Sequence, residues 1–137
     1  MSFVLDCSVT MSWAFDEERD ACSDASLELL REGDAWAPAI WSLEVMNCLL
    51  VAERTRRLTR AKVDYFTNRI SKFRIHIRSI EFAPVITVLL PLAREYKLSS
   101  YDAAYLELAM REGLPLATRD GRLKAAAKRA GLALVTG

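Results

Sequence analysis

The chain has 137 residues, of which 52% are hydrophobic and 27% are charged, and its formal net charge is +1. A chain of this size buries roughly 70% of the surface that its unfolded form exposes, which favours one globular domain over residues 1–137 and excludes a disordered or fibrous protein. Although the total charge is balanced, basic side chains are concentrated in two segments, at residues 54–60 and 119–129.

Three cysteines, Cys7, Cys22 and Cys48, form no Cys-x-x-Cys pair, so the sequence indicates neither a disulfide framework nor a zinc site. Because residues typical of a core or a helix flank each of them, we expect reduced, buried thiols. The amino-terminal residues lack the basic segment of a signal peptide. The charge-free apolar run at 82–93 is too short to cross a bilayer, which needs about 20 residues. We therefore expect a cytoplasmic protein without a membrane segment.

The first half of the chain predicts short strands that alternate with helices. Short apolar runs are typical of buried parallel strands, whereas apolar residues spaced three and four apart predict helices. The elements expected in this half are a strand at 3–5, a helix at 20–31, a strand at 35–37, a helix from Ser42 to about Arg54, and a helix that begins after Thr59 and continues to Phe73. The helix from Ser42 carries a wide apolar stripe that includes Leu43, Met46 and Leu50.

The second half continues this alternation. Its expected elements are a strand in which Ile75, Ile77 and Ile80 alternate with polar residues, a helix at 85–97, a helix at 101–112, a strand at 114–117, a helix at 120–130 and a strand at 132–135. The helix at 101–112 has almost no polar face, so we expect it to be the buried helix. Strands that alternate with helices predict an α/β domain with a mostly parallel sheet.

Four acidic residues stand where apolar segments end or begin, namely Asp6, Glu44, Asp102 and Asp120. In parallel sheets, ligands bind beyond the carboxyl ends of the strands, so these acids can meet at one edge. Two carboxylates about 6 Å apart repel by roughly 3 kcal/mol at an effective dielectric constant near 20, which favours a bound cation. Mg²⁺ and Mn²⁺ prefer oxygen ligands and can activate water against a phosphodiester.

Each acid also has a structural interpretation. Glu44 and Asp102 are predicted in first helical turns, where the helix dipole stabilises a carboxylate, and Asp120 could cap its helix. Asp6 is the hardest to explain in this way, because an acid that ends an apolar strand is not needed there for capping. The single histidine, His76, leaves no residues for a two-histidine nuclease mechanism, and the sequence contains no phosphate-binding loop of the type GxxxxGK[ST].

Four segments resemble PIN-domain proteins, in the same order along the chain: Val4–Val9, Leu43–Asn47, Ser100–Ala109 and Leu116–Asp120. The most specific of them is the run Tyr-Asp-Ala-Ala-Tyr at 101–105. The similarity covers essentially the whole chain, and it is to the VapC-type ribonuclease toxins of bacterial toxin–antitoxin pairs. It implies a PIN-like three-layer α/β/α domain with a central, mostly parallel sheet.

The resemblance implies an Mg²⁺- or Mn²⁺-dependent endoribonuclease that hydrolyses RNA phosphodiester bonds. In it, Asp6, Glu44, Asp102 and Asp120 would be the catalytic, metal-binding acids, with Asp6 and Asp102 as the principal ligands. Polar side chains that would support the acids or contact substrate are Ser8, Asn47, Ser100 and Thr118, and those that would hold the RNA backbone are Arg119, Arg122 and Lys124.

The resemblance also implies a homodimer and an antitoxin protein whose carboxyl-terminal segment covers the site. The region of Trp13, Trp36 and Trp41, with Met11 and Phe15, could offer an apolar groove for that segment, although core packing also explains these aromatic residues. Two other functions stay open: a non-catalytic PIN-like module that binds RNA or protein, and a hydrolase of small phosphate compounds. An assay for metal-dependent cleavage of RNA distinguishes the nuclease from both of these alternatives.

Overall fold

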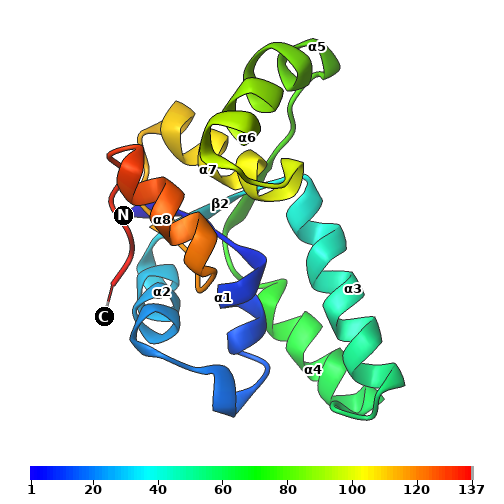
Figure 1. Cartoon of the computed structure of the whole chain (residues 1–137). Helices are drawn as coiled ribbons and strands as arrows, with labels where there is room; N and C mark the ends of the chain where they lie inside the picture. Colours follow the sequence, from blue (N-terminus) through cyan, green and yellow to red (C-terminus); the bar gives the residue numbers. More distant parts are fainter. Residues whose placement is uncertain (137) are drawn as a thin grey trace.

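The computed structural model describes residues 1–136 and places a parallel sheet between two layers of helices (Figure 1). The strands are β1 (Ser2–Leu5), β2 (Asp34–Pro38), β3 (Ile75–Arg78) and β4 (Leu116–Ala117), in the spatial order β3-β2-β1-β4. Every pairing between them is parallel, and Val4 of β1 lies between Trp36 and Leu116 of its two neighbours. The prediction of a three-layer α/β/α domain with a parallel sheet is confirmed.

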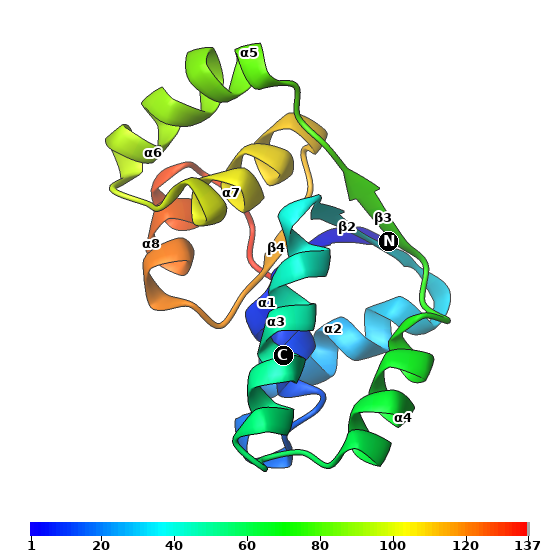
Figure 2. The same ribbon diagram turned by 90° about the vertical axis from the view of Figure 1, so that its right-hand side faces the viewer.

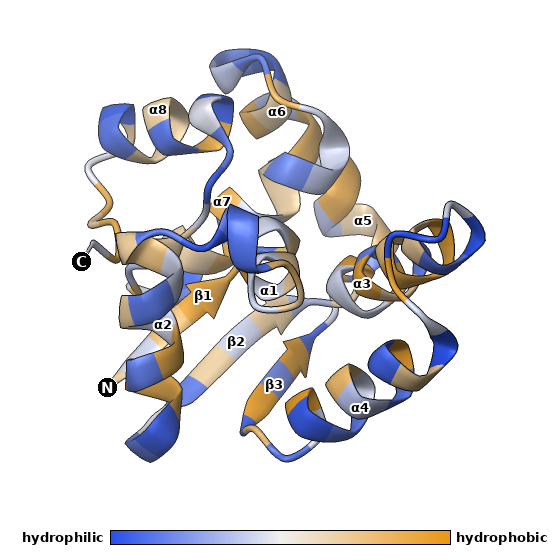
Figure 3. Ribbon diagram, turned by 90° about the horizontal axis from the view of Figure 1, so that it is seen from below, coloured by the Kyte–Doolittle hydropathy of each residue, from blue (hydrophilic) through white to orange (hydrophobic). Residues whose placement is uncertain are grey.

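The helices divide between the two sides of the sheet. One side is covered by α7 (Ser100–Glu112), which packs against α8 (Gly121–Arg129) and against a segment made of α5 (Phe82–Pro84), the π-helical turn η2 (Val85–Leu89) and α6 (Leu90–Tyr96). The other side holds α1 (Cys7–Ser12), the 3₁₀ turn η1 (Asp16–Glu18), α2 (Ala21–Glu32) and α4 (Arg60–Ile70), which lie in front of the sheet in Figure 3. Helix α3 (Ile40–Arg54) runs along the right-hand side of the molecule in Figure 1, so it faces the viewer in Figure 2.

Helix α7 is buried, as its sequence predicts. Ala103, Tyr105, Leu106 and Ala109 are completely removed from solvent, because this helix contacts β1, β2 and β4. Such a position leaves little room for polar side chains in the middle of the helix, whereas Tyr101 and Met110 near its two ends are exposed. Asp102 at the start of α7 is thereby fixed relative to the carboxyl ends of the strands.

The predicted helix starts coincide with side-chain caps. Thr59, Ser99 and Asp120 each accept a hydrogen bond from the backbone N–H three residues later, at 3.2, 3.1 and 2.9 Å respectively. These bonds satisfy amide groups that have no partner within the helix. Gly113 closes α7 with a φ of +64°, a conformation that glycine adopts without strain.

Several predicted boundaries are wrong. Helix α1 was not predicted, because six residues are too few to show a helical period. Helix α3 begins at Ile40, so Glu44 lies in its second turn rather than its first. The helix predicted at 85–97 starts at Phe82 and contains the π turn, and the strand predicted at 132–135 is only a bridge between Leu116 and Leu134.

The wide apolar stripe predicted on α3, which also includes Val45, Leu49 and Val51, lies partly on the outside and partly in the core. Leu43, Met46 and Leu50 are exposed by 68, 48 and 38%, whereas Val45 and Leu49 face the core. The helix is apolar on both sides, so its sequence alone does not indicate which side packs inward.

The aromatic residues predicted to line an antitoxin groove are mostly core residues. Trp13, Trp41, Met11 and Phe15 are only 6–8% exposed. The indole N–H of Trp13 donates to a backbone carbonyl of α2 at 2.9 Å, and that of Trp41 donates to a hydroxyl of α1 at 3.0 Å. Trp36 is half-buried under the guanidinium of an arginine in β3, 4.2 Å from the ring centre. The indoles of Trp13 and Trp41 thus join α1 to its neighbours, and Trp41 also lines a surface groove between α3 and α4.

The cysteines differ in exposure. Cys7 is buried, Cys22 is half-buried and Cys48 is exposed on α3, so the prediction of three buried thiols is wrong for Cys48. All three thiols are free. Among residues 1–136, no helix combines the length and apolar character that a membrane crossing requires.

Candidate active site

Asp6 lies at the carboxyl end of β1, where the chain turns into α1. Its side chain is almost fully buried, and its Oδ2 atom accepts hydrogen bonds from the hydroxyls of Ser8 and Thr118, both at 2.7 Å. Thr118 reaches Asp6 because β1 and β4 are parallel neighbours that end together. Burial raises the pKa of Asp6, the two hydroxyls partly oppose that effect, and the charge of Asp120 adds to it.

Glu44 approaches the same edge from α3. Its Oε1 atom accepts a hydrogen bond of 2.6 Å from the hydroxyl of Tyr105. Burial raises the pKa of Glu44, and the charges of Asp6 and Asp102 raise it further. Burial also raises the pKa of Tyr105 far above its ordinary value, so the phenol keeps its proton and acts as a donor.

Tyr105 was not among the predicted site residues. It is completely buried in α7, one helical turn after Asp102. A buried tyrosine hydroxyl usually needs a hydrogen-bond partner. A tyrosine in an otherwise apolar helix could therefore have been identified as a residue that contacts a polar group of the site. No local pattern indicates that the partner is Glu44, 61 positions earlier in the chain.

Asp102 and Asp120 occupy helix starts. Asp102 lies in the first turn of α7, and Asp120 is the N-cap of α8, so the structural interpretations of these two acids are both correct. Burial and the charges of Asp120 and Asp6 nevertheless raise the pKa of Asp102, while Arg122 lowers it. The two carboxylates therefore also take part in the electrostatics of this edge.

The four acids form one electrostatic cluster. Asp6 is coupled to Asp120, Glu44 to Asp6 and Asp102, and Asp102 to both Asp6 and Asp120. In the part of the chain that the structure describes, no three acidic, histidine or cysteine side chains are already arranged to hold a metal ion. The donor set does fit a hard divalent cation, since it consists of carboxylate oxygens whose mutual repulsion such an ion would relieve.

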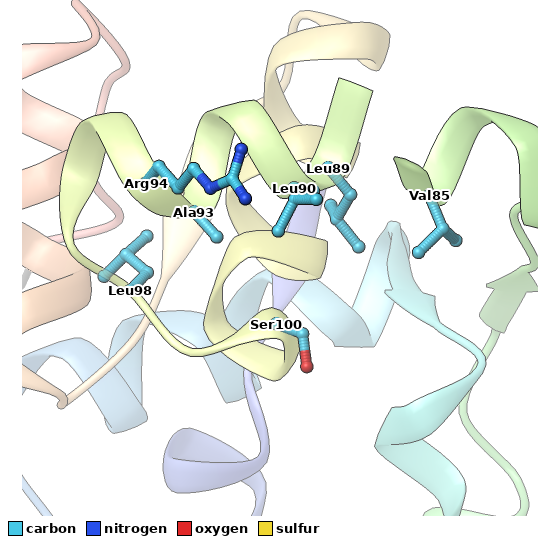
Figure 4. A pocket seen from close by; sticks show the side chains of 7 residues that line it. All are labelled: Val85, Leu89, Leu90, Ala93, Arg94, Leu98 and Ser100. Carbon is cyan, nitrogen blue, oxygen red and sulfur yellow. The ribbon is translucent and has the colours of Figure 1, made fainter. Parts of the chain in front are cut away.

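Two of the predicted supporting residues, Asn47 and Ser100, make no side-chain hydrogen bond to the four acids within residues 1–136. Asn47 is exposed on α3 and lines a cavity of about 330 Å³ together with Cys48 and Val51. Ser100 lines a different cavity of about 390 Å³ between α6 and α7, beside apolar residues such as Leu90 (Figure 4). The hydroxyl that caps the backbone of Asp102 belongs to Ser99, not to Ser100.

The three predicted RNA-binding residues differ in their surroundings. The Nε atom of Arg119 donates to Asp20 Oδ2 at 3.0 Å, and Nη1 lies 3.9 Å from Glu18 Oε1. Arg122 is exposed and near enough to the acids to affect Asp102, and Lys124 is partly exposed on the same helix. Arg119 thus has acidic partners within the protein, and Arg122 faces the candidate site.

The comparisons with known proteins agree with this fold. The family model described as the PIN domain matches residues 3–129. PAE2754 from Pyrobaculum aerophilum is 23% identical, with a TM-score of 0.68 over 98% of this chain and 92% of that chain. A toxin–antitoxin complex from Klebsiella pneumoniae is 19% identical (TM-score 0.59, 86% of each chain), and VapBC2 from Rickettsia felis, bound to a DNA fragment from its promoter, is 14% identical (TM-score 0.65, 98% and 97%). No curated protein matches the sequence.

Proposed function

Since this chain belongs to the PIN domain family, whose members are generally nucleases, we propose that it is a metal-dependent endoribonuclease. The observation that carries the proposal is the convergence of Asp6, Glu44, Asp102 and Asp120 at the carboxyl ends of β1 and β4. Capping acids that stood apart would not raise the pKa values of Asp6, Glu44 and Asp102 through their charges. A cluster that does so in a partly buried site favours a bound cation, and we assign Mg²⁺ or Mn²⁺ to it.

Asp6 and Asp102 would hold the ion, and Glu44 and Asp120 would complete its surroundings, directly or through water. When bound, such an ion supplies positive charge to the scissile phosphate and makes water a better nucleophile. The protein's own contribution is orientation. Two hydroxyls fix the carboxylate of Asp6, and the phenol of Tyr105 fixes that of Glu44.

The substrate would be held mainly through its phosphates. Arg122 lies near enough to Asp102 to lower its pKa, and it would contact the RNA backbone together with Lys124 of the same helix, α8. Contacts of this kind give affinity that falls with salt and does not depend on base sequence.

We further propose that the protein is the toxin of a toxin–antitoxin pair and acts in the cytoplasm. Its similarity in fold to the Klebsiella pneumoniae toxin–antitoxin complex and to VapBC2 supports this role. A groove of about 310 Å³ between α3 and α4, lined by Val45, Met46, Phe73 and Ile77 among others, would accept the apolar side chains of an antitoxin segment. Trp41 is part of the lining of this groove, so one of the three tryptophans expected to offer an antitoxin site does contribute to it.

A homodimer is the oligomeric state that the exposed apolar residues favour. Leu43 and Leu50 on α3 and Phe82 and Ile86 at α5 and η2 are all more than a third exposed. Both segments lie toward the right-hand side of Figure 1. Apolar surface of this kind is typical of an interface between protein chains.

The direct test is cleavage of total cellular RNA by the purified protein in Mg²⁺ or Mn²⁺. We expect discrete fragments that disappear with EDTA and in the Asp102→Asn variant. Asp64→Asn is the matched control, because Asp64 is an exposed acid of α4 outside the cluster, and this variant should cleave normally.

Uncut RNA from a folded, metal-supplied and antitoxin-free sample would contradict the nuclease. RNA binding without cleavage would then favour the non-catalytic binding module. Release of inorganic phosphate from small phosphate compounds, without RNA cleavage, would favour the small-substrate hydrolase.

A further inference from the structure

The loop of residues 118–120 determines where two hydroxyl protons point. The backbone N–H of Arg119 donates to Ser8 Oγ at 2.9 Å, and the N–H of Asp120 donates to Thr118 Oγ1 at 3.0 Å. A hydroxyl that accepts from an amide can still donate its own proton, and the available acceptor is Asp6 Oδ2, 2.7 Å from each hydroxyl oxygen. The position of this loop therefore sets the orientation of the buried carboxylate.

The side chain of Arg119 ties the loop to the start of α2. Its Nε atom donates to Oδ2 of Asp20, while Oδ1 of Asp20 accepts from the backbone N–H of Ser23 and caps α2. A second acid, Glu18, lies 3.9 Å from the guanidinium. Each carboxylate oxygen of Asp20 thus has its own partner, and the anchor joins segments that are 99 positions apart in the sequence.

We propose that Arg119 is a positioning residue rather than an RNA-binding residue: its ion pair with Asp20 holds the 118–120 loop so that Ser8 and Thr118 donate to Asp6. The proposal rests on the nuclease function and specifies how the protein keeps one of the site's acids in place. The side chain of Arg119 is only 28% exposed, and its guanidinium group is already paired with Glu18 and Asp20. A phosphate would have to displace them.

The two roles predict different kinetics. Loss of a positioning residue lowers kcat and leaves KM for RNA nearly unchanged, because the substrate still binds while the acids are misplaced. Loss of a phosphate contact raises KM and reduces the salt dependence of binding. Arg122 is the matched control, since it is an exposed arginine three residues later on α8 with no acid bonded to its side chain among the described residues.

We expect Arg119→Ala to lower kcat roughly 10- to 100-fold with KM changed less than about twofold. Asp20→Asn should give a similar loss, because it removes the charge while an amide oxygen can still cap α2. The double variant should lose no more than Arg119→Ala alone, since both changes remove the same interaction. Arg122→Ala should instead raise KM.

A second measurement does not depend on activity. Hydrogen exchange at the backbone amides of Arg119 and Asp120 reports the two loop bonds directly. Both amides should lose protection in Arg119→Ala and Asp20→Asn, and both should keep it in Arg122→Ala. Arg119→Lys, which retains the charge, should show intermediate protection and kcat, and it tests the role even if Arg119→Ala unfolds.

The outcomes separate this inference from the proposed function. If wild type cleaves RNA but Arg119→Ala raises KM as Arg122→Ala does, Arg119 is an RNA contact and the inference is wrong. Unchanged protection of both amides in Arg119→Ala would overturn it as well. If wild type does not cleave RNA, the nuclease proposal fails, while the exchange data still decide whether Arg119 anchors the loop.

Discussion

Asp6 illustrates a conflict between folding and function at a single residue. Its carboxyl is 5% exposed, and its pKa is raised mainly because burial disfavours the charged form. The hydroxyls of Ser8 and Thr118 reduce this cost, but the pKa remains above its ordinary value. Without a cation, the ionised form of Asp6 therefore lowers the stability of the folded protein at neutral pH.

This conflict predicts that Asp6→Asn is more stable than wild type and inactive. In the absence of metal at pH 7 the variant should have the higher Tm, and its RNA cleavage should fall at least about 100-fold. Because the folded-state pKa lies above the unfolded value of about 3.9, the cost of ionising Asp6 is complete above the folded-state pKa and vanishes below the unfolded one. The difference in Tm should thus shrink as the pH falls toward 4. Scanning calorimetry across this range measures it.

The control for that experiment is Asp64→Asn on the exposed side of α4, which should change neither Tm nor cleavage. Mg²⁺ provides an independent check, because a ligand that binds only the folded state raises its Tm. Mg²⁺ should raise the Tm of wild type and of Asp64→Asn more than that of Asp6→Asn. An Asp6→Asn protein that melts below wild type at pH 7, or that cleaves RNA normally, would contradict this account of Asp6.

At the scale of the elements, the sequence predicted what depends on local pattern. The strand that ends at Asp6 and the caps at Thr59, Ser99 and Asp120 follow from residue type and spacing, and all are present. Helix α1 was missed because six residues are too few to show a period.

The orientation of α3 illustrates the limit of such patterns. Leu43 is exposed and Val45 is buried, although both are apolar, because only the packed neighbours decide which side of the helix faces inward. The same limit applies to the site. The four acids could be named because they stand at the ends of apolar segments, and Ser8 and Thr118 were expected as their supports through the resemblance alone. The partners of Glu44 and Arg119 come from distant parts of the chain, and no local pattern indicates them.

Helix α7 supports the site as an element, because Asp102 and Tyr105 both depend on its packing. Leu106 is completely buried against the sheet, and truncating a buried leucine typically costs about 2–5 kcal/mol. We expect Leu106→Ala to lower the free energy of unfolding by an amount in this range, measured by urea denaturation. Met110 of the same helix is 44% exposed, and Met110→Ala should cost less than about 1 kcal/mol. Equal losses for the two variants would mean that α7 is not anchored through its inner face.

At the scale of the whole molecule, charge and apolar surface are unevenly distributed. A net charge of +1 hides an acidic cluster at the carboxyl ends of the strands and a basic helix, α8, beside it. This separation favours binding a polyanion through its backbone while a cation occupies the acids. The apolar side chains that are exposed on α3 are not explained by packing within a single chain.

Those residues predict self-association through α3. We expect wild type to have about twice the 15.4 kDa mass of one chain in light scattering after size exclusion, with dissociation on dilution. Leu43→Asp combined with Leu50→Asp should give the monomer mass, because it places charges in the apolar contact. Tyr65→Asp, which changes an exposed aromatic residue of α4, should remain dimeric. If the α3 variant stays dimeric, the contact uses another face, and if wild type is monomeric, the exposed side of α3 is free to bind a different protein.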